Sequence, residues 1–210
     1  GTTTPATVKN LTWNLGSDNY QYFNCKVENC TINGRPSIHT FASFKDCKLI
    51  NTYAADYCIT TYGAPCTFEN CTFSSQGKFV NVYGETQTSS KEVTATNCKF
   101  INLKGSVYKA AFNIKGNKDG QIQHTHVIVN NCTTEGLFPD HTTTSGEAVF
   151  FDGGLIMFDD PAWEDDVYAV VDGVTYYPYF TMDANGNYSV NSATGLKKAI
   201  GHSLPMISVN

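Results

Sequence analysis

The sequence predicts an all-β chain built from a repeated coil, and three observations support this. A six-residue phrase recurs along the first two thirds of the 210 residues. Apolar and polar residues alternate over short runs, which is typical of strands. Thr, Asn, Val, Tyr and Phe are abundant and suit strands and turns better than helices. No helical periodicity precedes residue 192.

The recurring phrase reads apolar or small, any residue, Asn or Asp, Cys, polar, apolar. It occupies residues 27–32, 44–49, 68–73 and 95–100, with a weaker copy at 129–133. The interval between successive cysteines grows from 17 residues (Cys30 to Cys47) to 34 residues (Cys98 to Cys132). Repeats of this length indicate a solenoid, and the unequal intervals indicate loops that bulge from one corner of the coil.

Over about residues 20–135 the sequence resembles right-handed parallel β-helix proteins of bacterial surfaces, in which phrases such as Phe-x-Asn-Cys-x-Phe recur once per coil. The resemblance implies stacked coils about 4.8 Å apart, with like side chains in ladders. It says little about function, because the same fold carries adhesins, phage tailspikes and polysaccharide-degrading enzymes.

Within such a ladder Asn tolerates a left-handed turn, and Cys is small enough for a narrow corner. Parallel stacking holds Cβ atoms about 4.8 Å apart, beyond the roughly 3.8 Å mean of disulfides. We therefore expect the phrase cysteines to be free, inward-pointing thiols at equivalent positions. A bridge among Cys25, Cys58 and Cys66 stays open.

We divide the chain into three parts. Residues 1–158 are expected to form the parallel β-helix with an N-terminal cap, residues 159–166 an acidic linker, and residues 167–210 a β-meander with a short helix at 193–200. Asp172-Gly173 is a strong hairpin signal within the meander. The tail either caps the last coil or begins a following module.

Charge and hydropathy exclude two classes of partner. The net charge is -5, and the sole arginine is Arg35, so clustered cations for nucleic acid are lacking. No apolar run approaches the roughly 18 residues that span a membrane. We expect an extracellular or cell-surface monomer.

An acidic cluster is the best candidate for chemistry. It comprises Asp159, Asp160, Glu164, Asp165 and Asp166. Such oxygen ligands suit Ca²⁺, and paired carboxylates can also cleave glycosidic bonds. A solvated acidic loop is the plainer interpretation. Calcium is the only cofactor that the sequence suggests.

Ligand contacts are expected at Trp163, Tyr177, Tyr179 and His141, because aromatic rings stack on the apolar faces of sugars. Alternate aromatic residues of this segment could equally form the core between the meander and the helix. His124 and His126 share one strand face, but two ligands are too few for a stable zinc site. The longer loops, residues 84–92, 115–123 and 135–146, are expected to carry binding residues.

The sequence favours a non-catalytic surface module, adhesin-like or glycan-binding, whose partner is a glycan or a host cell-surface protein. The Asn-Thr-Asp, Gly-His-Gly and Arg-Ile-Lys signatures of polygalacturonase-like β-helices are absent. The alternative is a carbohydrate-active β-helix enzyme, a lyase or a hydrolase. A groove of Asp and Lys beside the parallel sheet would favour that enzyme, whereas a wall of Thr, Ser and Asn would favour the module.

Overall fold

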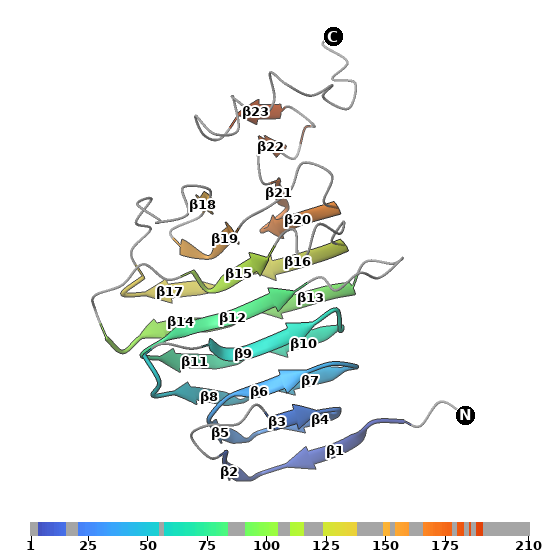
Figure 1. The fold of residues 1–210 in the computed structure, drawn as a ribbon, viewed down its shortest axis with the longest axis vertical. Helices are drawn as coiled ribbons and strands as arrows, with labels where there is room; N and C mark the ends of the chain where they lie inside the picture. Colours follow the sequence, from blue (N-terminus) through green and yellow to red (C-terminus); the bar gives the residue numbers. More distant parts are fainter. Residues whose placement is uncertain are drawn as a thin grey trace.

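The computed structural model is a stack of parallel strands in three sheets (Figure 1). It describes residues 4–15, 21–54, 57–83, 91–104, 110–115, 124–137, 149–151, 154–159, 166–177, 180–182, 185 and 188–190. Within these residues the regular elements are strands, with no α-helix. The helix expected at 193–200 lies outside them. The all-β prediction is confirmed, and the arrangement is compatible with a parallel β-helix.

Each sheet takes one strand from each pass of the chain. Sheet A contains β1 (Ala6–Lys9), β4 (Cys25–Glu28), β7 (Ala42–Lys45), β10 (Cys66–Glu69), β13 (Lys91–Thr96), β16 (His124–Asn130) and β20 (Asp166–Val171). Sheet B contains β2 (Thr12–Asn14), β5 (Thr31–Asn33), β8 (Lys48–Asn51), β11 (Thr72–Ser75), β14 (Lys99–Asn102) and β17 (Thr133–Glu135). Sheet C contains β3 (Gln21–Phe23), β6 (Pro36–Ile38), β9 (Tyr57–Tyr62), β12 (Lys78–Tyr83), β15 (Phe112–Lys115) and β19 (Ile156–Asp159).

One coil is a pass through sheets A, B and C in that order, and the register between coils confirms the repeat. Lys48 pairs in parallel with Thr31 on one side and Thr72 on the other. Thr72 in turn pairs with Lys99. Each of these residues directly follows a phrase cysteine, so Cys30, Cys47, Cys71 and Cys98 occupy equivalent positions, as predicted.

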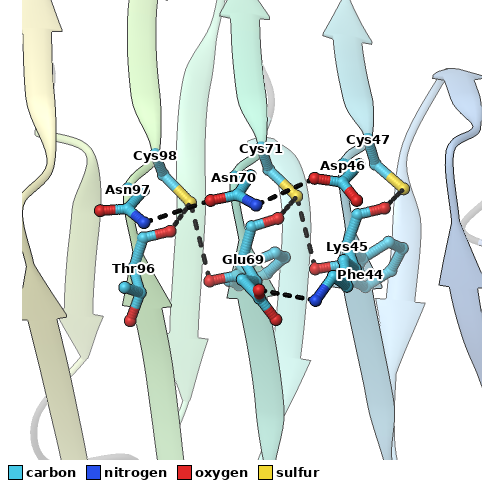
Figure 2. A network of polar contacts seen from close by, with 11 residues as sticks. Phe44, Lys45, Asp46, Cys47, Glu69, Asn70, Cys71, Thr96, Asn97 and Cys98 are labelled. Carbon is cyan, nitrogen blue, oxygen red and sulfur yellow. Dashed lines mark hydrogen bonds and ion pairs between the residues drawn. The ribbon is translucent and has the colours of Figure 1, made fainter.

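The corner between sheets A and B is a left-handed turn repeated in every coil. Asn or Asp stands there with φ between 50° and 59°, at Asn10, Asn29, Asp46, Asn70, Asn97 and Asn131. Few other residues adopt this conformation without strain. The side-chain amides also pair along the stack: Asn70 donates to Asp46 over 2.9 Å and Asn97 donates to Asn70 over 3.2 Å (Figure 2).

The cysteines form a second ladder directly beside these asparagines. The Cys71 thiol lies 3.4 Å from the carbonyl of Glu69 and 3.4 Å from that of Phe44 in the preceding coil (Figure 2). All eight cysteines are free, and all but Cys25 are buried. Burial raises the pKa of the Cys58 thiol to about 12. Burial therefore favours the protonated thiol at Cys58, which lies outside the ladder phrase.

The bore of the stack is filled by aromatic and branched side chains from all three sheets. Phe68, Phe73, Phe100 and Phe112 are no more than 1% exposed. Phe73 stacks on Phe100 with ring centroids 4.7 Å apart, and Phe100 meets Phe112 edge-on at 5.3 Å. One apolar core thus joins sheets B and C, which positions their outer faces rigidly.

Sheet A extends beyond residue 158, because β20 pairs in parallel with β16. The chain then reverses at Asp172-Gly173 into β21 (Val174–Tyr176), which pairs antiparallel with β20. Antiparallel β22 (Phe180–Met182) and β23 (Tyr188–Val190) complete the expected meander at the C-terminal end (Figure 1). In sheet C, β18 (Val149–Phe151) pairs antiparallel with β19.

Candidate functional site

The outer faces of sheets A and B carry side chains that satisfy one another. Lys9 pairs with Glu28 over 2.6 Å, and Lys45 pairs with Glu69 over 2.7 Å. On sheet B, Lys99 pairs with Glu135 over 2.6 Å. These pairs are exposed, so each stabilises the fold by at most about 1 kcal/mol. In each pair the positive charge is matched by a negative charge, as expected where side chains stabilise the fold rather than bind a ligand.

Sheet C differs, because a row of polar side chains on its strands is deeply buried. Ser37, Thr60, Asn81 and Asn113 are in register and are 1–2% exposed. They alternate with core residues such as Val82 and therefore point to the outer face. Polar groups that are buried in this way need hydrogen-bond partners.

For Asn113, one partner comes from a long side chain that crosses the neighbouring strand. The hydroxyl of Tyr57, in β9, accepts a hydrogen bond of 2.7 Å from Asn113 Nδ2 in β15. Because β12 lies between these strands, the Tyr57 side chain reaches across it. Lys78 Nζ, at the start of β12, donates to the same hydroxyl over 3.2 Å and lies 4.9 Å from the centre of the Tyr57 ring.

Asp159 completes this network at the end of β19. Its Oδ2 accepts from Asn113 Nδ2 over 3.2 Å and forms an ion pair with Lys115, its register partner in β15. The Lys115 and Asp159 side chains are 26% and 18% exposed, so this pair is less solvated than those on sheets A and B. We call Tyr57, Lys78, Asn113, Lys115 and Asp159 the sheet C cluster.

The electrostatics of the cluster are unbalanced. Burial and then the Lys115 ammonium lower the pKa of Lys78, while Asp159 offsets part of this effect. Among the described residues no carboxylate forms an ion pair with Lys78, whereas Lys115 has Asp159. Two ammonium groups therefore share one carboxylate, and Asn113 Oδ1 is buried without a hydrogen-bond partner.

An aromatic row leads along the outer face of sheet C to this cluster. Tyr22, His39, Tyr62 and Tyr83 follow one another with centroid separations of 4.7, 4.5 and 5.1 Å. Tyr62 and Tyr83 are nearly parallel, at 5°, so each covers one ring face of the other. Tyr22, at 76% exposed, retains an open face. Tyr83 pairs with Lys115 in register, which joins the row to the cluster.

The predicted acidic cluster is divided by the structure between two sheets. Asp159 lies in sheet C and contacts Lys115, whereas Asp166 begins β20 in sheet A. Asp166 accepts from His124 Nδ1 and His126 Nε2, each over 3.2 Å. The other three members, Asp160, Glu164 and Asp165, lie outside the described residues, so calcium binding stays a prediction.

The histidines on β16 form a small group with Asp166 and Tyr168. His126 stacks on Tyr168 with centroids 3.9 Å apart. Burial raises the pKa of Asp166, but the hydrogen bonds from His124 and His126 outweigh it and lower that pKa overall. Within the described part of the chain, no three His, Cys, Asp or Glu side chains are placed to hold a metal ion.

Of the four predicted ligand contacts, only Tyr177 is described. It is half-buried beside Tyr168, with ring centroids 5.9 Å apart. Trp163, Tyr179 and His141 lie outside the described residues, as does most of each predicted binding loop. Two of those loops follow the ends of β12 and β15 directly in the chain.

The sequence patterns did not indicate Tyr57, Lys78 or Asn113, and they indicated Lys115 only as the first residue of a predicted binding loop. The available signal is a polar residue between apolar or small neighbours in each of three strands, at Thr60, Asn81 and Asn113. Aligning those positions would have placed the three strands in register. Arg35 lies four coils from Asp159, or roughly 19 Å at about 4.8 Å a coil, and its guanidinium packs 5.4 Å from the Tyr53 ring.

A hollow of about 280 Å³ lies beside sheet B. It is lined by Asn14, Leu15, Asn33, Gly34, Ile50, Thr52 and Tyr53. No charged side chain lines it, and its two amides pair with each other over 2.7 Å. Its chemistry is less distinctive than that of the sheet C cluster.

Comparisons with protein-family models, curated proteins and solved structures gave no match. No helix among the described residues is long and apolar enough to cross a membrane. Any statement about function therefore depends on the residues of this chain.

Proposed function

We propose that this chain is a non-catalytic module of an extracellular surface protein that binds a saccharide on the outer face of sheet C. We also propose that the stack is a right-handed parallel β-helix, the hand taken by nearly all parallel crossover connections. The saccharide proposal rests on one contrast. Charged side chains on the outer faces of sheets A and B form exposed Lys–Glu pairs, whereas the sheet C cluster is partly buried and joins an ammonium group without a carboxylate partner among the described residues to amide and phenol groups beside an aromatic row.

Saccharide recognition suits this combination. Sugar hydroxyls both donate and accept hydrogen bonds, and the cluster offers amide, phenol, ammonium and carboxylate groups within four successive coils. The strands hold these groups on a packed core, so little ordering cost accompanies binding. Along most of the aromatic row a ligand would contact ring edges and hydroxyl groups. At Tyr22 the open ring face can stack on a sugar.

The test is calorimetric titration with a panel of oligosaccharides, using paired tyrosine variants. Tyr83→Ala on sheet C should weaken binding at least about tenfold, equivalent to about 1.4 kcal/mol. Tyr168→Ala is the matched control, because Tyr168, like Tyr83, is half-buried and stacked on another ring, in this case that of His126 on sheet A. Equal losses in the two variants, or no binding by any member of the panel, would overturn the proposal.

A carbohydrate-active enzyme is the second candidate, and one observation favours it. The Tyr57 hydroxyl lies beside the Lys78 ammonium and the Asn113 amide, and Asp159 is close by, so proton donors and acceptors share one surface. We nevertheless expect no cleavage. Release of new reducing or unsaturated ends from a polysaccharide, abolished by Asp159→Ala, would make the enzyme the better assignment.

A further inference from the structure

We propose that Lys78 and its neighbours form a binding site for an anionic substituent, a carboxylate or a sulfate, on an acidic saccharide. This deepens the proposed function and depends on it, since it names the ligand class for the same face. The site comprises Lys78, Tyr57 and Asn113, flanked by the Lys115–Asp159 pair.

The first argument is the position of the Lys78 ammonium. It is half-buried, and its described contacts are a neutral hydroxyl at 3.2 Å and the face of the same Tyr57 ring. Taking a cation partly out of water costs free energy that a phenol only partly restores. An anion beside Lys78 would supply the missing counter-charge, as Asp159 does for Lys115.

The second argument is the charge balance of the surface. With two ammonium groups and one carboxylate, the cluster carries one net positive charge, although the whole chain has a net charge of -5. At long range, the net negative charge of the whole chain therefore repels a polyanion. A positive site on an acidic protein selects anions locally, through short contacts rather than a long-range field.

The third argument is the unsatisfied oxygen of Asn113. Asn113 is 2% exposed, and its Nδ2 has three oxygen atoms within reach, at 2.7, 3.0 and 3.2 Å, while its Oδ1 has no partner. Lys78 and Lys115 also donate to the Tyr57 hydroxyl and to Asp159, so the atom left without a partner among these groups is Asn113 Oδ1. A hydroxyl donor that enters beside Tyr57 would correct this, so the ligand should carry hydroxyls as well as an anion.

An acidic saccharide meets both requirements, because it bears an anion and hydroxyls on one rigid ring. The aromatic row extends from Tyr83 away from the cluster along the stack, which provides a path for neighbouring sugars. A simple inorganic anion would satisfy Lys78 but not the Asn113 oxygen. It should therefore bind more weakly than the saccharide.

The experiment uses calorimetry with the full chain and tetrasaccharides of uronic acids, their methyl esters, and sulfated tetrasaccharides. The acids should bind, and methyl esterification, which removes the charge while preserving the sugar, should abolish most of the heat. Raising NaCl from 50 to 300 mM should weaken binding of the acids but not of the esters. Binding of uronates alone, or of sulfated sugars as well, identifies the anion.

Two lysine variants complete the design. Lys78→Met keeps the stem that packs on Tyr57 and should weaken binding of the acids at least about tenfold. Lys99→Met, which removes an exposed ammonium from sheet B, should change affinity less than about twofold. Thermal melting of both variants checks that they fold.

The outcomes separate this inference from the proposed function. Equal binding of acids and esters, with Lys78→Met unaffected and Tyr83→Ala weakened, would overturn the anion site and leave saccharide binding intact. Binding of acids that is lost equally in Lys78→Met and Lys99→Met would indicate non-specific attraction and overturn the inference. If no saccharide binds, both proposals are wrong.

Discussion

The corner between sheets A and B and the outer face of sheet C share one stacking geometry, but the corner stabilises the fold whereas the sheet C face leaves groups available for a ligand. At the corner each coil presents the same residue types, so asparagine pairs with asparagine and thiol with the carbonyl of the preceding coil. On sheet C the coils present Tyr57, Lys78, Lys115 and Asp159 instead. Where the same residue types repeat, polar side chains form hydrogen bonds with their equivalents in the next coil. Where unlike residues replace the repeat, some polar groups remain available for a ligand.

We expect one apolar core to support both regions, so substitutions in that core should have the largest effect on stability. Phe73→Ala in sheet B and Phe112→Ala in sheet C should each reduce the free energy of unfolding by about 3–5 kcal/mol, because both rings are fully buried. Lys99→Ala should cost less than about 0.5 kcal/mol. Urea denaturation measures all three. A small loss at Phe112 alone would show that sheet C is packed separately.

The next effect concerns the corner itself. Asn70→Ala should cost about 2–3 kcal/mol, since alanine tolerates a φ of 54° less well than asparagine and the change removes the ladder bonds to Asp46 and Asn97. Asn70→Gly removes only the bonds and should cost about 1 kcal/mol. If Gly is no better than Ala, the turn conformation does not select this residue.

Two ion pairs then compare the faces directly. Asp159→Ala should destabilise the fold by about 1–2 kcal/mol, because it leaves the Lys115 ammonium partly buried and removes an acceptor from Asn113. Glu69→Ala, which frees the exposed Lys45, should cost less than about 0.5 kcal/mol. Chemical denaturation at low and high salt measures both. Equal losses would remove the distinction between the faces.

The smallest effect lies at the end of sheet A, where unlike residues also meet. The histidine bonds hold the pKa of Asp166 below its ordinary value of 3.8 despite burial. A depressed folded-state pKa stabilises the protein above the ordinary pKa, and that contribution is lost as the pH falls through the folded value. The stability difference between the native chain and Asp166→Asn should therefore shrink below pH 3.8. A difference that grows on acidification would contradict this.

The sequence was sufficient to predict the repeat because each coil carries its own local signal. The phrase around Cys47 or Cys71 combines a left-handed turn residue with alternating apolar positions, and both properties are readable without knowledge of the fold. The Asp172-Gly173 hairpin was predicted for the same reason. These features depend on neighbours in the chain.

The sheet C cluster could not be predicted in this way, because its members are distant in sequence. Tyr57 and Asn113 are 56 residues apart and meet only when three coils are stacked in register. The number of residues per coil varies with loop length, so no fixed interval in the sequence reveals the contact. The Asp159–Asp166 stretch looked like one acidic group, yet its two described ends lie in different sheets, since the chain passes from sheet C to sheet A between them.

The central claim is that ligand binding belongs to sheet C and not to the repetitive faces. Amide chemical-shift mapping with a uronic-acid tetrasaccharide tests it most directly. The account predicts the largest shifts in β9, β12, β15 and at Asp159, with little change in β7, β10 and β11. Shifts concentrated on sheets A and B, or spread evenly around the stack, would contradict it.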